Sequence, residues 1–226
     1  PLGAGDLTPA ALALLDDLAA VGVAPRLGRV GAEAWARMDQ TRFAARADRD
    51  QSDYVYAAQD LIQLRGNRFH RKKNHLNKFL KSQPHQYRPL DESLVRAVLE
   101  MQEAWCTLRD CAEDPGLGAE DRAIHEALCH FGQLDYQGGA ILIEGKVEAF
   151  SLGEPLNPDT VVIHIEKANP EIPGLYAAIN QRFAENAWAG YQWINREQDL
   201  GLEGLRQAKE SYNPHHLVDK YELTPA

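Results

Sequence analysis

The chain is predicted to adopt an α+β fold in which helices and strands form α/β layers. Three observations lead to this prediction. Helical and extended patterns alternate early in the chain, a long amphipathic helix precedes a hairpin of apolar strands in the middle, and single helices and strands alternate again toward the C-terminus. The 226 residues, 44% hydrophobic and 25% charged, suffice to bury a substantial core and have the composition of an ordinary globular protein.

The first part of the chain carries helix start and stop signals. A threonine followed by a proline favours the first turn of a helix, and a glycine favours its end. The expected elements are a helix from Thr8 to Gly22, a strand within 23–30, a helix over 32–39 and a strand over 43–47. This alternation predicts part of an α/β layer.

A basic segment follows. Residues 61–90 contain no Asp or Glu and carry +8, so the rest of a chain whose net charge is −9 carries −17. A helix is expected over 67–81, with Lys72 inside its apolar arc and Lys73 at the edge of that arc. The asymmetry indicates a local anion-binding surface, with Lys72 as a cation lining a cleft. The alternatives are a solvated basic helix face and a lysine whose ammonium reaches water along the apolar surface.

The second half changes from helices to strands near residue 140. Amphipathic helices are expected over 91–112 and 120–134, and two strands within 140–151 meet in a hairpin at Gly145. The elements expected after the hairpin are a strand over 159–167, a helix over 174–187, a strand over 190–194, a helix after Asp199 and a strand over 217–223.

Cysteine count and hydropathy bear on the compartment. Cys106, Cys111 and Cys129 form no CxxC pair, and an odd, sparse set is typical of reduced thiols in the cytoplasm. No apolar run approaches the ~20 residues that span a bilayer, and no signal-peptide pattern opens the chain, so a cytoplasmic protein without a transmembrane segment is expected. No metal site is expected, because His125, Cys129 and His130 offer too few ligands for a closed zinc site.

The element order of the second half (helix, helix, three antiparallel strands, helix, strand, helix, strand) is that of a GNAT acyltransferase domain. Three segments carry a closer resemblance: RDQSDYVYAAQDLIQLRGNRFHRKKNHLNKF at 49–79, VVIHIEKANPEIPGLYAAIN at 161–180 and INREQDLGLEGLRQAKESYNPHHLVDKYEL at 194–223. On these segments the chain resembles the phosphatidylglycerol lysyltransferase C-terminal domain family. The resemblance implies two GNAT-like folds in tandem: a partial N-terminal half over 1–88 that includes the basic helix, and a complete C-terminal domain over 89–226.

The resemblance also implies an activity, because the family is related to enzymes that transfer amino acids from aminoacyl-tRNA to lipids or cell-wall peptides. We expect an acyl- or aminoacyltransferase that moves an activated group from acyl-CoA or aminoacyl-tRNA to an amine or hydroxyl acceptor. The attack is expected to be direct, without a metal or a covalently bound cofactor. Of the usual glycine-rich pattern for acyl-CoA only Gly174 is present, so the 3′ end of a charged tRNA is the preferred donor.

Five residues are candidates for the chemistry. Acyl transfer needs a base for the attacking group, a donor for the developing oxyanion and an acid for the leaving group. Glu166 and His164 are expected on one face of the strand that lines the acyl donor in GNAT folds, and either is a candidate base. Tyr212 is placed like the general-acid tyrosine of many GNAT enzymes, and Arg196 and Glu197 follow a strand end where the sheet would open. The alternatives are a cross-strand pair, an aromatic residue packed on the core, and a salt-bridge network that includes Asp199.

Other residues are candidates for holding the donor. Gly174 opens a helix at the position where GNAT enzymes bind the donor's pyrophosphate. Asp199 is expected to cap the helix after it, whose glycines leave backbone amides bare for an anion or else allow tight helix–strand packing. The full candidate set is Gly174, Asp199, Gly201, Gly204, Arg206, Lys209, Lys72 and Lys73.

Two other interpretations stay open. In one, the chain is a non-catalytic GNAT-fold module that binds a nucleotide-like or anionic ligand. In the other, it is an RNA-binding accessory protein that uses the basic helix.

Overall fold

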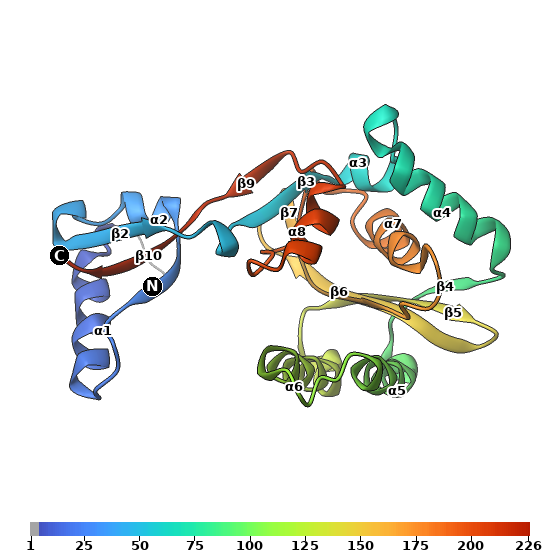
Figure 1. The fold of residues 1–226 in the computed structure, drawn as a ribbon, viewed down its shortest axis with the longest axis horizontal. Coiled ribbons are helices and arrows are strands. Elements are labelled where there is room, and N and C mark those ends of the chain that lie inside the picture. Colours follow the sequence, from blue (N-terminus) through green and yellow to red (C-terminus); the bar gives the residue numbers. More distant parts are fainter. Residues whose placement is uncertain (1–4) are drawn as a thin grey trace. The chain divides into compact units, whose positions relative to one another are not determined.

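A computed structural model describes residues 5–226 of the chain (Figure 1). Its residues group into two compact units, and each is formed by segments that are distant in the sequence. Unit 1 contains residues 5–55, Glu197–Glu210 and Pro214–Ala226, and unit 2 contains Tyr56–Arg196 and Ser211–Asn213. The predicted boundary between 88 and 89 falls inside a strand of unit 2 and separates neither unit; as a division of the chain into two GNAT-like halves it stays a prediction.

Unit 1 is built around a three-stranded antiparallel sheet. Its elements are α1 (Thr8–Ala20), β1 (Leu27–Gly31), α2 (Ala32–Ala36), β2 (Phe43–Ala47), the first residues of β3 (Asp53–Ala57), α8 (Glu203–Glu210), β9 (His216–Val218) and β10 (Lys220–Pro225), with the 3-10 turns η1 (Gln40–Arg42) and η2 (Arg49–Gln51). The strand order β1-β10-β2 places the last strand of the chain between two early ones (Figure 1). Where one strand was expected over 217–223, the chain forms two, and β9 pairs with β3 instead of this sheet.

Unit 2 contains the larger sheet. The strands of this sheet that lie wholly in unit 2 follow the order β4 (Gln86–Pro89), β5 (Gln137–Ile143), β6 (Lys146–Pro155), β7 (Thr160–Ala168) and β8 (Trp193–Asn195). The first four are antiparallel, and β8 runs parallel to β7. The helical elements are α3 (Ala58–Gln63), η3 (Asn67–Phe69), α4 (His70–Ser82), α5 (Glu92–Leu108), α6 (Pro115–Cys129), η4 (Phe131–Gln133) and α7 (Leu175–Ala187). Helices α5 and α6 cover one face of the sheet and α7 covers the other (Figure 1).

The amphipathic character predicted for the helix over 91–112, which is α5, explains most of this packing. Leu94, Val98, Met101 and Trp105 are all buried in a core with the apolar residues of α6, β5 and β6. Leu108, the last residue of the helix, is 51% exposed. Expectations for the hairpin at Gly145 and for the helices over 67–81 and 174–187 are confirmed. The expected α+β class is likewise confirmed.

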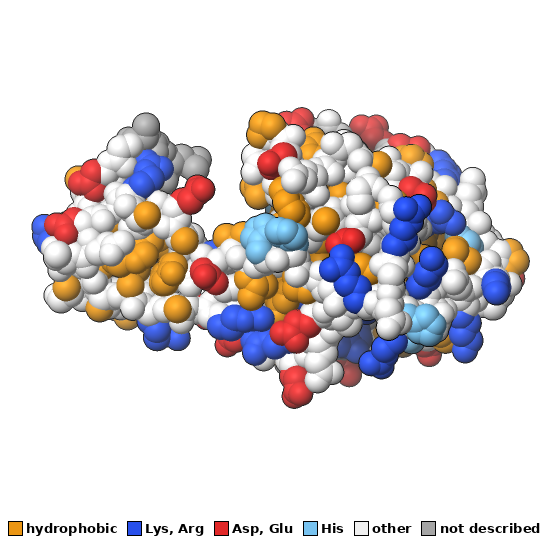
Figure 2. All heavy atoms as spheres, turned by 90° about the horizontal axis from the view of Figure 1, so that it is seen from above, with side chains coloured by type: hydrophobic (Ala, Val, Ile, Leu, Met, Phe, Trp, Pro, Cys, Tyr) orange, Lys and Arg blue, Asp and Glu red, His pale blue; other side chains and the backbone are white. Residues whose placement is uncertain are grey.

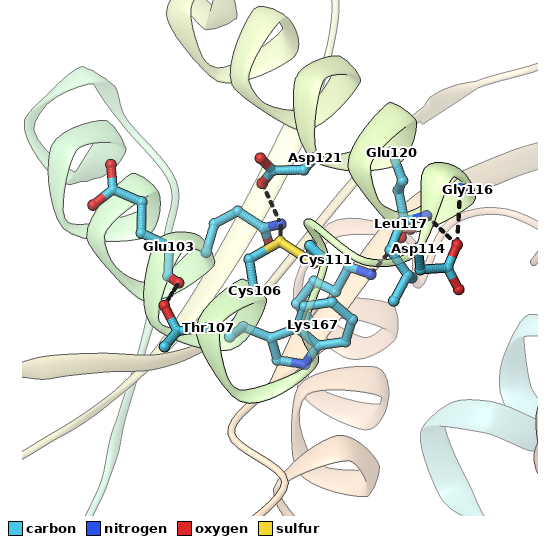
Figure 3. The surroundings of a disulfide bond; sticks show 12 residues. Glu103, Cys106, Thr107, Cys111, Asp114, Gly116, Leu117, Glu120, Asp121 and Lys167 are labelled. Atoms are coloured by element: carbon cyan, nitrogen blue, oxygen red, sulfur yellow. Dashed lines mark hydrogen bonds and ion pairs between the residues drawn. A yellow bond between two sulfur atoms is a disulfide. The ribbon is translucent and has the colours of Figure 1, made fainter.

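A disulfide closes the end of α5. Cys106 and Cys111 are bonded, with their Cα atoms 5.0 Å apart, and Figure 3 shows the bond beside Asp121 of α6. The prediction that all three thiols are reduced is therefore wrong for two of them. That prediction was based on the odd number of cysteines and on the absence of a CxxC motif. The chain turns back after α5, however, and this turn brings together two cysteines that are five positions apart. Cys129 is free and exposed.

We predict that replacing both bonded cysteines by serine destabilises the protein by roughly 2 kcal/mol, the chain-entropy value for so short a loop. The measurement is urea denaturation of Cys106→Ser/Cys111→Ser without reductant. Cys129→Ser is the matched control and should leave the midpoint unchanged. An equal midpoint for the double variant and the wild-type chain would contradict the prediction.

Candidate functional site

A carboxylate–guanidinium pair lies in unit 2 where β7 and β8 run side by side. Nη2 of Arg196, the residue directly after β8, lies 2.8 Å from Oε1 of Glu166 on β7. The Nδ2 of Asn180, on α7, donates to the other carboxylate oxygen at 2.9 Å. The side chains of the ion pair are only 12% and 13% exposed. Both carboxylate oxygens therefore have donors, which fixes the orientation of Glu166.

Two tyrosine rings pack against this arginine. The guanidinium carbon of Arg196 lies 5.0 Å from the ring centroid of Tyr212 and 5.7 Å from that of Tyr56. The two rings meet edge to face at 6.5 Å. Burial by itself would lower the pKa of Arg196, but Glu166 and the two tyrosines outweigh it and raise that pKa. The arginine is thus a fixed positive charge in a desolvated place, where it attracts a negative charge more strongly than it would in water.

A second cation reaches the same ring from α4. The Nζ of Lys72 lies 4.2 Å from the centroid of Tyr212. Burial and then the nearby charge of Arg196 lower the pKa of Lys72 to about 8, although Glu166 acts in the opposite direction. Lys72 therefore remains charged at pH 7 but loses its proton far more readily than an ordinary lysine. Its ammonium is held over an aromatic ring, as expected of a positioned cation, whereas its neighbour Lys73 is exposed.

Tyr212 lies at the centre of these contacts. It follows α8 in the Ser-Tyr-Asn segment that belongs to unit 2, and only 5% of the residue is exposed. Burial raises its pKa, against the opposing effect of Arg196, so its hydroxyl keeps its proton at neutral pH. A general acid needs that proton, and the same burial also fits the alternative of an aromatic residue packed on the core.

A β-bulge separates the two candidate bases of β7. Leu152 of β6 pairs with Ile165 and the next residue, Gly153, pairs with Ile163, so His164 is the extra residue of the bulge. Ile165 joins the core under α5 and α6, and the ring of His164 lies 5.7 Å from that of Tyr136, which packs on that core.

Glu166 faces α7 instead, through its bond to Asn180. The expectation that His164 and Glu166 share a face is therefore wrong, because strict alternation does not hold across a bulge. His164 contacts Glu154 at 3.0 Å, which is the cross-strand pair considered as its alternative. Lys167 lies on the opposite face of β7 from Glu166 and donates a hydrogen bond to Glu120 (Figure 3).

A separate polar cluster lies in unit 1 around Asp199. This residue is fully buried and accepts hydrogen bonds from the Tyr54 hydroxyl at 2.6 Å and from Nε of Arg206 at 2.8 Å. Arg49 lies 3.3 Å from the same carboxylate, and Arg206 also binds Asp50. The hydrogen bond from Arg206, followed by those from Tyr54 and Gly201, holds the pKa of Asp199 well below its usual range despite burial.

This cluster is a salt-bridge network, as one alternative proposed, but its members differ from the expected set. Arg196 belongs to unit 2, and the partners of Asp199 come from η2, β3 and α8. Lys209 is buried, with its Nζ 5.8 Å from the centroid of Tyr54, so Arg206 and Lys209 both face this cluster. The charge of Arg206 is balanced by Asp199 and Asp50, both in unit 1.

The two glycines at the start of α8 differ: Gly201 lies in the turn before the helix, and Gly204 is the second residue of the helix. Gly201 has φ +74°, and a Cβ there would lie 2.8 Å from a carboxylate oxygen of Asp50, so packing accounts for it. Gly204 has no atom within 4 Å of a Cβ position, and the first residues of the helix around it are exposed. Asp199 accepts from the amide of Gly201 instead of the first turn of α8, so the predicted helix cap is wrong.

The remaining candidates have backbone roles. Glu197 has φ +55°, and its carbonyl accepts from the amide of Tyr54 at 3.1 Å. Gly174 has φ +87°, and a Cβ there would lie 2.5 Å from the carbonyl oxygen of His75 on α4. Close packing of α4 against the start of α7 therefore accounts for this glycine.

The structure adds two residues to the site that sequence reasoning missed, Tyr56 and Asn180. Tyr56 ends a run, Asp53 to Tyr56, in which every residue is buried. In the sequence, the β-forming run Tyr54-Val55-Tyr56 is the signal for a buried strand, but nothing there indicates which ring meets Arg196. Asn180 could have been found from the sequence, because a polar residue on the apolar face of a helix such as α7 is unusual.

A profile of the family described as "Phosphatidylglycerol lysyltransferase, C-terminal" matches residues 1–224. The chain belongs to this family. Among curated proteins none matches the chain. In the part of the chain that the structure describes, no helix has the length and apolar character required to cross a membrane.

Solved structures agree with the family assignment. A conserved protein of unknown function from Bacteroides thetaiotaomicron is 36% identical, with a TM-score of 0.91 over 100% of this chain and 78% of that one. The C-terminal domain of a putative lysylphosphatidylglycerol synthetase from Agrobacterium fabrum gives 12% identity and a TM-score of 0.67, covering 94% and 71% of the two chains.

L-PGS from Bacillus licheniformis gives 13% identity and a TM-score of 0.66, covering 93% and 70% of the two chains. At these two lower identities the likeness concerns the fold, which is the expected GNAT-like α+β fold. The family assignment thus points to a role of the aminoacyltransferase type.

We predict that Asp199→Asn lowers the free energy of unfolding by about 2–3 kcal/mol at pH 7, because charge-assisted hydrogen bonds to a buried carboxylate are lost. The folded-state pKa lies below the unfolded value, so this contribution is complete above about pH 4 and disappears as the pH falls toward the folded pKa. Urea denaturation at pH 7 and in acid tests this. The exposed Asp219→Asn is the control, and a difference that does not shrink in acid contradicts the prediction.

We predict that the ammonium of Lys72 titrates near pH 8. NMR of the lysine ¹³Cε resonances measures this midpoint, with Lys72→Arg to assign the signal. Removing the like charge in Arg196→Gln should raise the midpoint, and Glu166→Gln should lower it. A midpoint above 10 in the wild-type chain would show that Lys72 is solvated.

Proposed function

We propose that the chain transfers an aminoacyl group from aminoacyl-tRNA to an amine or hydroxyl acceptor by direct attack of the acceptor on the donor ester. One observation carries the proposal. Glu166, Arg196, Lys72 and Tyr212 come from four separate segments and meet in one partly desolvated cluster of unit 2. Membership of the phosphatidylglycerol lysyltransferase C-terminal family supports the class of reaction.

Each side chain has a role in this reaction. Glu166 accepts the proton of the attacking amine or hydroxyl, and Arg196 orients that carboxylate and stabilises negative charge that develops beside it. The new bond forms at the ester carbonyl, and the bond to the tRNA ribose oxygen then breaks. Tyr212, which keeps its proton at neutral pH, supplies a proton to that oxygen.

The donor-binding surface is proposed to follow α4. Lys72 faces the cluster, while basic side chains on the outer face of the helix and before it are exposed: Arg65, Arg68, Arg71, Lys73, Lys78 and Lys81. Figure 2, seen from the side on which α4 lies, shows Lys and Arg side chains gathered on this face. Such a surface suits a polyanion, and acyl-CoA is the weaker candidate because packing accounts for Gly174, its one sequence signal.

We predict that Glu166→Gln and Tyr212→Phe each reduce turnover by about 10²–10⁴-fold, the usual contribution of general acid–base catalysis, with donor affinity within a few-fold of wild type. The measurement is transfer of a radiolabelled amino acid from tRNA to an added amine, together with donor binding by fluorescence anisotropy. His164→Gln is the matched control, because that side chain lies on the other face of β7, and its turnover should be nearly normal.

The same two measurements test the main alternative. A non-catalytic module would bind the donor and show no turnover in the wild-type chain. Unchanged turnover in Glu166→Gln would remove this residue from the mechanism.

We predict that Lys73→Glu and Lys78→Glu weaken tRNA binding and reduce its dependence on salt, because fewer counterions are released. Binding isotherms over ~50–200 mM salt give the slope. The control is Lys146→Gln, an exposed lysine on β6 that is paired with Glu148. Equal slopes for the α4 variants and the wild-type chain would place tRNA elsewhere.

A further inference from the structure

Two lysines of unit 2 lie over aromatic rings, and they differ in the negative charge beside them. The Nζ of Lys167 lies 3.8 Å from the ring centroid of Trp105 and 2.8 Å from a carboxylate oxygen of Glu120. The Nζ of Lys72 lies 4.2 Å from the ring centroid of Tyr212, and among residues 5–226 no Asp or Glu oxygen lies within ion-pair distance of it. Lys167 therefore has a paired anion, whereas the ammonium of Lys72 has the face of a ring.

The surroundings of Lys72 favour its neutral form. Burial removes part of the water that would solvate the ammonium, and the positive charges of Arg196 and Arg71 act against it. Glu166 acts in the opposite direction, but its two oxygens are already bonded to Arg196 and Asn180. With a pKa of about 8, roughly 9% of Lys72 is neutral at pH 7, against roughly 0.04% of an ordinary lysine.

A neutral amine in this position can react with an electrophile. The nitrogen then has a free electron pair, which an ammonium lacks. A lysine that is desolvated or lies next to another cation is a common form of activated amine. Lys72 is also partly exposed, so a small reagent can reach it from solvent. The cluster thus combines reactivity with access.

We propose that the Nζ of Lys72 is a nucleophile that activated carboxylic esters acylate. The neutral Nζ attacks the ester carbonyl carbon and forms an amide bond with it. The bond from that carbon to the ester oxygen breaks, the oxygen keeps the electron pair, and the proton lost by Nζ goes to water. The inference goes beyond the proposed function and does not require transfer to an external acceptor.

Acylation would change the charge of the cluster. An amide nitrogen carries no charge, so the reaction removes one of the two cations beside Glu166 and leaves Arg196. Lys72 is therefore a modification site at which a small chemical change alters the electrostatics of the candidate active site.

The test is acetylation by p-nitrophenyl acetate at pH 7, stopped at low conversion. The remaining amines are then blocked with deuterated acetic anhydride in denaturant, and tandem mass spectrometry gives the extent of acetylation at each lysine. We expect Lys72 to react about tenfold faster than its exposed neighbour Lys73, because its larger neutral fraction outweighs the lower basicity of its amine. In guanidinium chloride, which removes the fold, the two rates should become equal.

Variants test the electrostatic cause. Glu166→Gln removes the negative charge that favours the ammonium and should speed acetylation of Lys72 about threefold. His164→Gln is the matched control, because that side chain is bonded to Glu154 on the other face of β7, and should leave the rate unchanged. Lys72→Arg should remove the fast-reacting amine and leave the rates of the other lysines as they are. Melting curves show whether each variant folds.

Two results would overturn the inference. One is an equal rate at Lys72 and Lys73 in the folded chain. The other is a preference for Lys72 that persists in guanidinium chloride, because the local sequence and not the fold would then cause it. Both results leave aminoacyl transfer from tRNA intact, since the turnover of Glu166→Gln tests that reaction separately.

Discussion

The ion pair between Glu166 and Arg196 is the interaction on which the candidate site depends. A guanidinium this buried is stable only with a counter-charge, and the carboxylate supplies it at 2.8 Å. The pair joins two parallel strands that are separated in sequence by α7, and it fixes the carboxylate against Asn180 on that helix. The positions of the two tyrosine rings and of Lys72 follow from it, because each is packed against the arginine or against the ring beside it.

The two polar clusters of the chain differ in chemistry. In unit 1 the buried Asp199 is surrounded by arginines and a tyrosine hydroxyl, and its charge is matched by donors within hydrogen-bond distance. That arrangement stabilises a fold and leaves little capacity for a ligand. In unit 2 two cations share one carboxylate, and one of them has a lowered pKa. Incompletely balanced charge and perturbed protonation are typical of functional sites, and for this reason we propose that the reaction takes place there.

The disulfide and the β-bulge show how local backbone geometry changes two predictions made from the sequence, the reduced state of the cysteines and the face of β7 on which His164 lies. The sparse cysteines suggested free thiols until the turn after α5 brought two of them together. The alternation of β7 placed His164 beside Glu166 until one extra residue moved it to the α5 side. In both cases the sequence shows which residues are present, but only the structure shows which side chains they contact.

The sequence by itself determined the α+β class, the helices over 67–81 and 174–187, the hairpin at Gly145 and the family, because periodicity, turn residues and segment similarity are local properties. It also indicated Lys72, since a lysine on an apolar arc is visible in one helix. Only the tertiary structure decided that Arg196 meets Glu166, that Tyr56 and Asn180 belong to the site, and that Asp199 is a structural hub. These are contacts between segments up to about 150 residues apart, whose geometry depends on strand register and helix packing.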